Sequence, residues 1–139
     1  MYYYKSPYDI SQYKIPFLKT KPSKAVLDFI PGHYCLFNRE FARKETVATA
    51  IILTEFLLLD EFYQDELIRH HKYGENWFRA PVEFVTLRTC ILRKEQETSV
   101  DKLIALRFVD QAIFGLPAMR HIRINKDIIK EYFESNKGT

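Results

Sequence analysis

The residues best suited to chemistry in this chain are polar and basic side chains between positions 79 and 123. Four stand at the start of a predicted helix: Arg93, Lys94, Gln96 and Thr98. Five more flank or follow that helix: Arg79, Lys102, Arg120, His121 and Arg123. Cationic side chains contact phosphates, and polar side chains on a helix can read base edges in the major groove. We therefore expect the first group in the groove of double-stranded DNA, and the second on phosphates or in the minor groove.

Two helices joined by a tight turn are expected to position these residues. Pro81 suits the first position of a helix over residues 81–89. The second helix, residues 93–107, is polar before Val100. Its apolar residues then follow at helical spacing: Val100, Leu103, Ile104 and Leu106. Such a helix is anchored by its C-terminal half and leaves its first turns free to enter a groove, as a recognition helix does.

A short strand before the helices and a hairpin after them complete the pattern. Aromatic residues favour a strand at 77–79. The hairpin, residues 108–124, is predicted from a Gly-Leu-Pro-Ala turn at 115–118 and from the alternation of 120–124. We expect Arg120 and Arg123 to point outward and form a basic wing tip. The order strand, helix, turn, helix, hairpin predicts an α+β, mainly α, winged helix-turn-helix.

The segment L.ALRFV…..GLPAMRHIRIN resembles the winged-helix domain at the N-terminus of phage replisome organisers and related DnaD-like replication initiators. The matching residues are Leu103, Leu106, Val109, Gly115, Pro117, Ala118, Arg120, Ile122, Ile124 and Asn125. The chain departs from the family at Arg107-Phe108, where Gly and an apolar residue are usual, and at His121, where an aromatic is commoner. The resemblance spans about residues 34–125 and implies a role in replication initiation or replisome organisation of a phage or mobile element.

Charge and proline distribution divide the chain into three parts. Residues 1–33 are predicted to be an extended arm with one short helix, because prolines interrupt them. Residues 34–125 form the predicted winged-helix domain, and 126–139 a C-terminal helix and tail. Residues 77–124 carry eight basic and five acidic side chains, whereas 25–76 carry five basic and nine acidic. This asymmetry is expected of a nucleic-acid-binding face and a non-binding face.

A long additional helix is predicted over residues 44–70, before the helix pair. Its apolar residues cover most of its circumference, so it should be buried on several sides. One side would face the winged helix. The surplus could be covered by the N-terminal arm or by a second subunit, and we expect a homodimer.

Other functional classes find little support in the sequence. Cys35 and Cys90 match no metal or redox spacing, and we expect buried thiols in a reducing cytoplasm. The adjacent His70 and His71 lack a third ligand at a suitable spacing, so we expect no metal and no cofactor. No phosphate loop or nucleophile elbow is present, and no apolar run is long enough for a bilayer. A cytoplasmic, non-enzymatic protein is expected.

Three functions remain open at this point. The first is a DNA-binding protein of replication initiation, which could also contact other replication proteins. The second is a transcriptional regulator on the same fold. The third is a winged helix that binds proteins and not DNA, because Glu95 and Glu97 lie on the predicted recognition helix and would repel phosphates.

Overall fold

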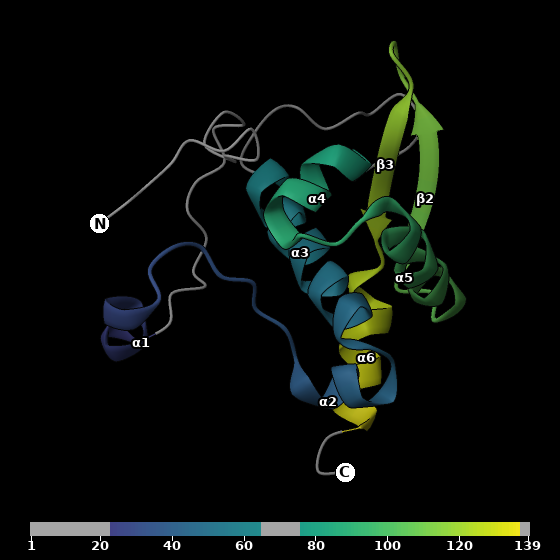
Figure 1. Cartoon of the computed structure of the whole chain (residues 1–139). Helices are drawn as coiled ribbons and strands as arrows, with labels where there is room; N and C mark the ends of the chain where they lie inside the picture. Colours follow the sequence, from purple (N-terminus) through teal and green to yellow (C-terminus); the bar gives the residue numbers. More distant parts are fainter. Residues whose placement is uncertain (1–22, 65–75, 137–139) are drawn as a thin grey trace.

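A computed structural model describes residues 23–64 and 76–136 of the chain. The expected His70–His71 loop, the first 22 residues and the end of the predicted 44–70 helix lie outside the described residues. The protein is α+β and mainly helical, with a small antiparallel sheet. Figure 1 shows the helices gathered beside a hairpin that projects past them, with the short α1 set apart from this body.

The described residues form six helices and three strands. Short α1 (Lys24–Phe29) and α2 (Arg39–Lys44) precede the long α3 (Val47–Gln64). Next come β1 (Phe78–Arg79), α4 (Val82–Thr89) and α5 (Arg93–Ala105). The chain then continues through β2 (Val109–Phe114), β3 (Met119–Ile124) and α6 (Lys126–Ser135).

The sheet places the two distant pieces of the chain side by side. Its strand order is β1-β3-β2, and both pairings are antiparallel. Phe78 of β1 lies opposite Ile122 of β3, which in turn lies opposite Gln111 of β2. The strand that precedes α4 is therefore tied to the hairpin that follows α5, and the helix pair is held between them.

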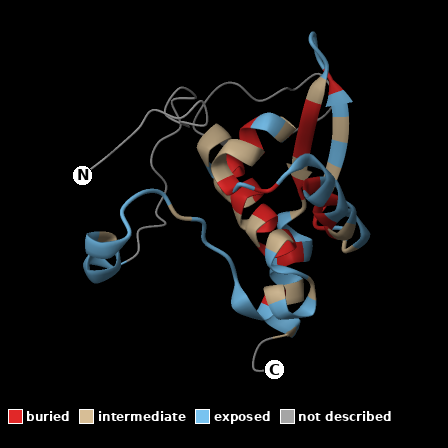
Figure 2. Ribbon diagram, viewed as in Figure 1, coloured by how far each residue is buried: buried red, intermediate tan, exposed pale blue. Residues whose placement is uncertain are grey.

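The core lies where α3 packs against α4, α5 and the sheet. Ile52, Phe56 and Leu59 of α3 are fully buried and meet Val100 and Leu103 of α5 in one cluster. Figure 2 shows buried residues concentrated on these elements and exposed ones on α1 and the hairpin tip. Apart from the exposed Val47, the described apolar side chains of α3 are buried or half-buried within one chain. A second subunit is thus not needed to cover α3.

The same core extends to α2 and α6 through a group of aromatic rings. Phe41 of α2 stacks on Phe108 with ring centroids 5.8 Å apart, and Tyr132 of α6 meets both rings edge-on. Asn38 caps α2 by accepting from the Phe41 amide at 2.8 Å. The sequence patterns had not predicted α2, although its capping residue was visible.

Candidate nucleic-acid interface

The connection between α4 and α5 is a turn of only three residues, Cys90 to Leu92. Cys90 ends α4 in the left-handed conformation (φ 63°) and its amide donates to the Thr86 carbonyl. The Thr86 hydroxyl donates to the Ile91 carbonyl at 2.9 Å, which secures the other side of the turn. The turn therefore fixes where α5 begins relative to α4.

The surface of α5 is divided lengthwise into an exposed face and a buried face. Gln96, Val100 and Leu103 are spaced four and three residues apart and are buried. Lys94, Thr98 and Asp101 have the same spacing on the opposite face and are exposed. The sequence predicted that the residues of α5 before Val100 are exposed. In the structure Gln96 and Ser99 are buried, and the others are exposed.

The cations that α5 presents differ in their pairing. Arg93 donates to Glu83 of α4 at 2.8 Å, but both side chains are largely exposed, so the pair is weak and exchangeable. Lys94 is exposed and Lys102 half-exposed, and neither pairs with an acid among the described residues. The acidic residues of the same helix offset these charges: Glu95, Glu97 and Asp101. The net charge of the helix surface is therefore close to zero, and its basic side chains do not form a continuous positive patch.

Gln96 and Arg120, both predicted as DNA contacts, are buried in the structure, and that prediction is wrong for each. Their exposed fractions are 0% and 7%. Arg120 Nη2 donates to Gln96 Oε1 at 2.9 Å, and Arg120 Nε donates to the Ala80 carbonyl at 2.7 Å. Burial lowers the pKa of Arg120 to about 10, with a further lowering by Arg93, so the guanidinium stays protonated at neutral pH. These hydrogen bonds are internal, and the two side chains are not available to DNA.

His121 and Arg123 also differ from the predicted basic wing. His121 is 1% exposed and stacks on Phe114, with centroids 3.7 Å apart, so it occupies an aromatic position in the sheet. Arg123 is part-exposed, donates to Asp110 Oδ2 at 2.9 Å and lies over the Trp77 ring at 4.8 Å. The prediction that Arg120 and Arg123 both point outward is wrong, because residues three apart on a strand face opposite sides of the sheet.

The hairpin tip carries no charge. Residues 114–119 read Phe-Gly-Leu-Pro-Ala-Met, and Leu116 is fully exposed at the turn. Between this hairpin and the first turns of α4 and α5 lies a hollow of about 360 Å³. Its lining includes Arg93 and Glu97 on one side and Ile113 and Met119 on the other. The remaining predicted cation, Arg79, is exposed on the edge strand β1, and β3 separates it from β2.

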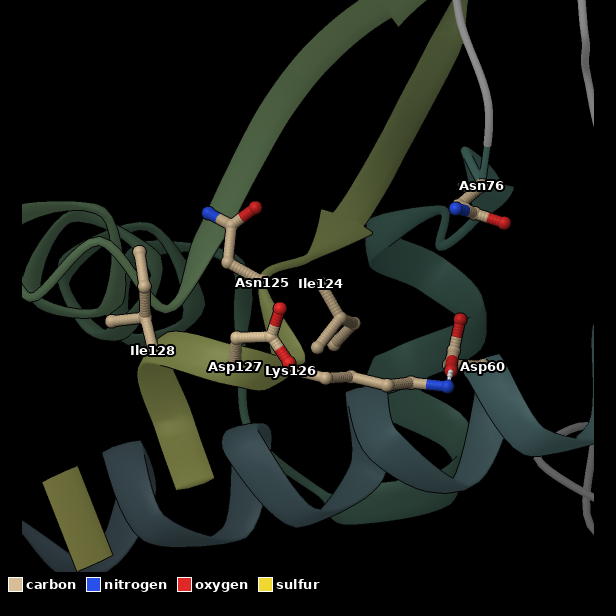
Figure 3. Close-up of a pocket in the computed structure, with 7 residues that line it drawn as sticks. All are labelled: Asp60, Asn76, Ile124, Asn125, Lys126, Asp127 and Ile128. Carbon is tan, nitrogen blue, oxygen red and sulfur yellow. Dashed lines mark ion pairs between the residues drawn. The ribbon is translucent and has the colours of Figure 1, made fainter. Parts of the chain in front are cut away.

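A second hollow, of about 410 Å³, lies at the start of α6, and Figure 3 shows its lining. Lys126 reaches the carboxylate of Asp60 on α3 at 2.7 Å, and Asp60 is buried whereas Lys126 is exposed. Asn76, Asn125 and Asp127 also contribute to its polar lining. This ion pair links the first residue of α6 to α3.

The two cysteines are not buried, contrary to expectation. Cys35 and Cys90 are both exposed free thiols, because one lies outside regular structure and the other in the α4–α5 turn. The Cys35 thiol nevertheless donates to the Arg88 carbonyl at 3.2 Å. Partial burial there, with the nearby Cys90 thiol, raises the pKa of Cys35.

The described part of the chain was searched for a metal site and for a membrane-spanning helix. Within residues 23–64 and 76–136, no three His, Cys, Asp or Glu side chains gather where they could hold a metal ion. None of the helices in these ranges combines the length and apolar character that crossing a membrane requires.

Comparison with protein-family models, with curated proteins and with solved structures finds no match for this chain.

Proposed function

We propose that this chain is a winged helix-turn-helix protein that binds double-stranded DNA, with α5 as the recognition helix. The order α3, β1, α4, α5, β2, β3 and the β1-β3-β2 sheet support the winged-helix assignment. A role in replication initiation or replisome organisation is supported by the sequence resemblance at residues 103–125 alone. A transcriptional regulator would use the same surface, and the two roles differ in their DNA target.

The observation that carries the proposal is the exposed face of α5. Lys94 and Thr98 lie one turn apart on it, and Lys94 is not neutralised by a described acid. Arg93 lies beside them and can exchange its exposed partner Glu83 for a phosphate. The interface that we propose is smaller than the sequence predicted. Three of the predicted contacts, Gln96, Arg120 and His121, are buried and are not part of it.

The proposal is tested by fluorescence anisotropy with a labelled random duplex over a range of salt concentrations. Each phosphate contact contributes about 0.9 to the slope of log affinity against log salt. We expect Lys94→Ala to reduce that slope by about one contact. Lys130→Ala removes another exposed cation, from α6, and should leave the slope unchanged. Equal slopes for the two variants, or no binding of wild-type protein at micromolar concentration and low salt, would contradict the proposal.

A second candidate, a winged helix that binds protein, is favoured by the uncharged hairpin tip. Leu116 is fully exposed, Ile113 is largely exposed, and the hollow beside them is lined by Val82, Ala118 and Met119. Apolar surface of this kind is suited to a protein partner, whereas a cationic tip would suit phosphate. If the wild-type protein does not bind the duplex in the anisotropy experiment, this candidate is favoured.

A homodimer was predicted from the apolar long helix. We propose that, if it forms, the segment around α1 contributes to it. Five large apolar side chains between residues 26 and 37 are exposed, and α1 contains no buried residue. A six-residue helix is too short to be stable alone. Sedimentation equilibrium of the whole chain and of a variant with Phe29→Ser and Ile30→Ser tests whether this segment joins two subunits.

A further inference from the structure

Gln96 is the point at which three parts of the candidate interface meet. Its Nε2 lies 3.1 Å from the Val82 carbonyl, 2.8 Å from the Thr86 hydroxyl and 2.7 Å from the Ile91 carbonyl. These acceptors belong to the start of α4, its middle, and the α4–α5 turn. Its Oε1 accepts from Arg120 of β3 at 2.9 Å. One buried amide therefore joins α5 to α4, to the turn and to the hairpin.

Arg120 extends this link from the central strand β3 to the end of the edge strand β1. Its Nε donates to the Ala80 carbonyl, and the Ala80 amide donates back to the Arg120 carbonyl at 3.0 Å. Ala80 follows β1 directly and precedes α4. The chain of hydrogen bonds thus runs from the β1–α4 junction through β3 to the first turns of α5.

The space beside this link is not filled by side chains. The hollow of about 360 Å³ separates the first turns of α4 and α5 from the hairpin, and Arg120 is part of its lining. Farther along, α5 is anchored by the fully buried Val100 and Leu103. At its N-terminal half, α5 is joined to the hairpin by the Gln96–Arg120 hydrogen bond, which lies beside this hollow.

We propose that the Gln96–Arg120 hydrogen bond sets the orientation of the N-terminal half of α5 relative to the β2–β3 hairpin. Both residues are positioning residues, since neither is exposed enough to touch a ligand. For DNA, the inference rests on the proposed function: helix and hairpin can contact one duplex together only at the orientation that this bond fixes. Binding groups must be held within about 0.5 Å of the productive geometry, so a small rotation of α5 is costly.

The orientation can be measured without DNA, from residual dipolar couplings of backbone amides in the free protein. Arg120→Met keeps much of the side-chain volume and removes every donor. We expect the couplings of residues 93–99 to depart from the wild-type orientation relative to β2 and β3, whereas those of residues 100–105 change less. Arg123→Met removes a guanidinium from the same strand on the other face, and should leave the couplings of α5 unchanged.

The same variants are then measured for affinity to a random duplex, at a temperature at which each is fully folded. We expect about a tenfold weakening for Arg120→Met and little change for Arg123→Met. If Arg120→Met does not fold, Arg120→Lys is used. It keeps the cation but lacks the planar guanidinium that reaches the two acceptors from two separate nitrogens, and it should show the same reorientation.

The possible results separate the two proposals. Unchanged α5 couplings in the folded Arg120 variant would overturn the positioning role. Altered couplings in a protein whose wild type binds no duplex would support the positioning role and reject DNA binding. Altered couplings with an unchanged duplex affinity would overturn the link between orientation and binding.

Discussion

Glu55 of α3 and Arg88 of α4 form an ion pair inside the protein, with Arg88 Nε donating to Glu55 Oε1. The Arg88 side chain is only 8% exposed and the Glu55 side chain only 6%. The pair links α4 to the long helix α3. Its partners are 33 positions apart in the chain, and neither had been singled out in the sequence.

Removal of one partner of this pair should be strongly destabilising, because the other charge remains buried without compensation. We expect Glu55→Ala to lower the free energy of unfolding by about 3–5 kcal/mol in urea titrations. Glu61→Ala, an exposed acid on the same helix, is the control and should change it by less than about 0.5 kcal/mol. The joint replacement Glu55→Leu with Arg88→Met should recover much of the loss. A small effect of Glu55→Ala alone would show that the pair does not hold α4.

The C-terminus of α5 offers a substitution that should stabilise the protein. Arg107 is left-handed (φ 64°), and the Phe108 amide donates to the Leu103 carbonyl while the Arg107 amide donates to the Ile104 carbonyl. This hydrogen-bond pattern favours glycine at position 107. We expect Arg107→Gly to raise the free energy of unfolding by about 0.5–1 kcal/mol.

The control for this prediction removes the same charge without relieving the backbone. Arg107→Ala retains a Cβ in the left-handed region and should not stabilise the chain. Thermal unfolding of the two variants beside the wild type distinguishes them. Equal melting temperatures for the Gly and Ala variants would mean that the backbone conformation at residue 107 costs nothing.

The Cys35 thiol should titrate above its ordinary pKa of 9.0, because its surroundings disfavour the thiolate. The neutral thiol is favoured in the folded state, so this contribution to stability is present below pH 9 and is lost as pH rises through the raised pKa. In a Cys90→Ser variant, alkylation of Cys35 by iodoacetamide should show a higher pH midpoint in native protein than in urea. Cys90→Ser itself removes one cause of the shift and leaves burial. Identical midpoints in both states would contradict the raised pKa of Cys35.

The hairpin arginine should matter less for DNA than the helix lysine. Arg123 already pairs with Asp110, so Arg123→Ala exchanges an internal ion pair for an unpaired carboxylate. We expect Lys94→Ala to reduce the salt slope by about 0.9 and Arg123→Ala by a clearly smaller amount. The slopes are compared on the same duplex by anisotropy. A larger loss for Arg123→Ala would restore the basic wing that the sequence predicted.

Much of the fold followed from local patterns. Hydrophobic spacing and the Pro81 and Gly115 signals placed α4, α5 and the hairpin within two residues of their observed bounds. Arg107 is a related case, since the resemblance had marked it as a departure from a usual glycine. The structure supplies the reason that glycine suits that position, namely a positive φ.

The candidate site was predicted less well, because charge was taken as a sign of exposure. Strand alternation places Arg120 on the same face as Ile122 and Ile124, and helical spacing places Gln96 with Val100 and Leu103. Both periodicities were visible in the sequence and pointed inward. The ion pairs Glu55–Arg88 and Asp60–Lys126 had no local signal, since each depends on packing between elements far apart in the chain.

The most direct test of the central claim is a map of amide chemical-shift changes in the ¹⁵N spectrum as a random duplex is added at low salt. If α5 is the DNA-binding helix, the largest changes should fall on its exposed face, at Lys94, Thr98 and Asp101, with small changes on α6. Changes confined to α6 or α1, or no changes at millimolar duplex, would contradict the account.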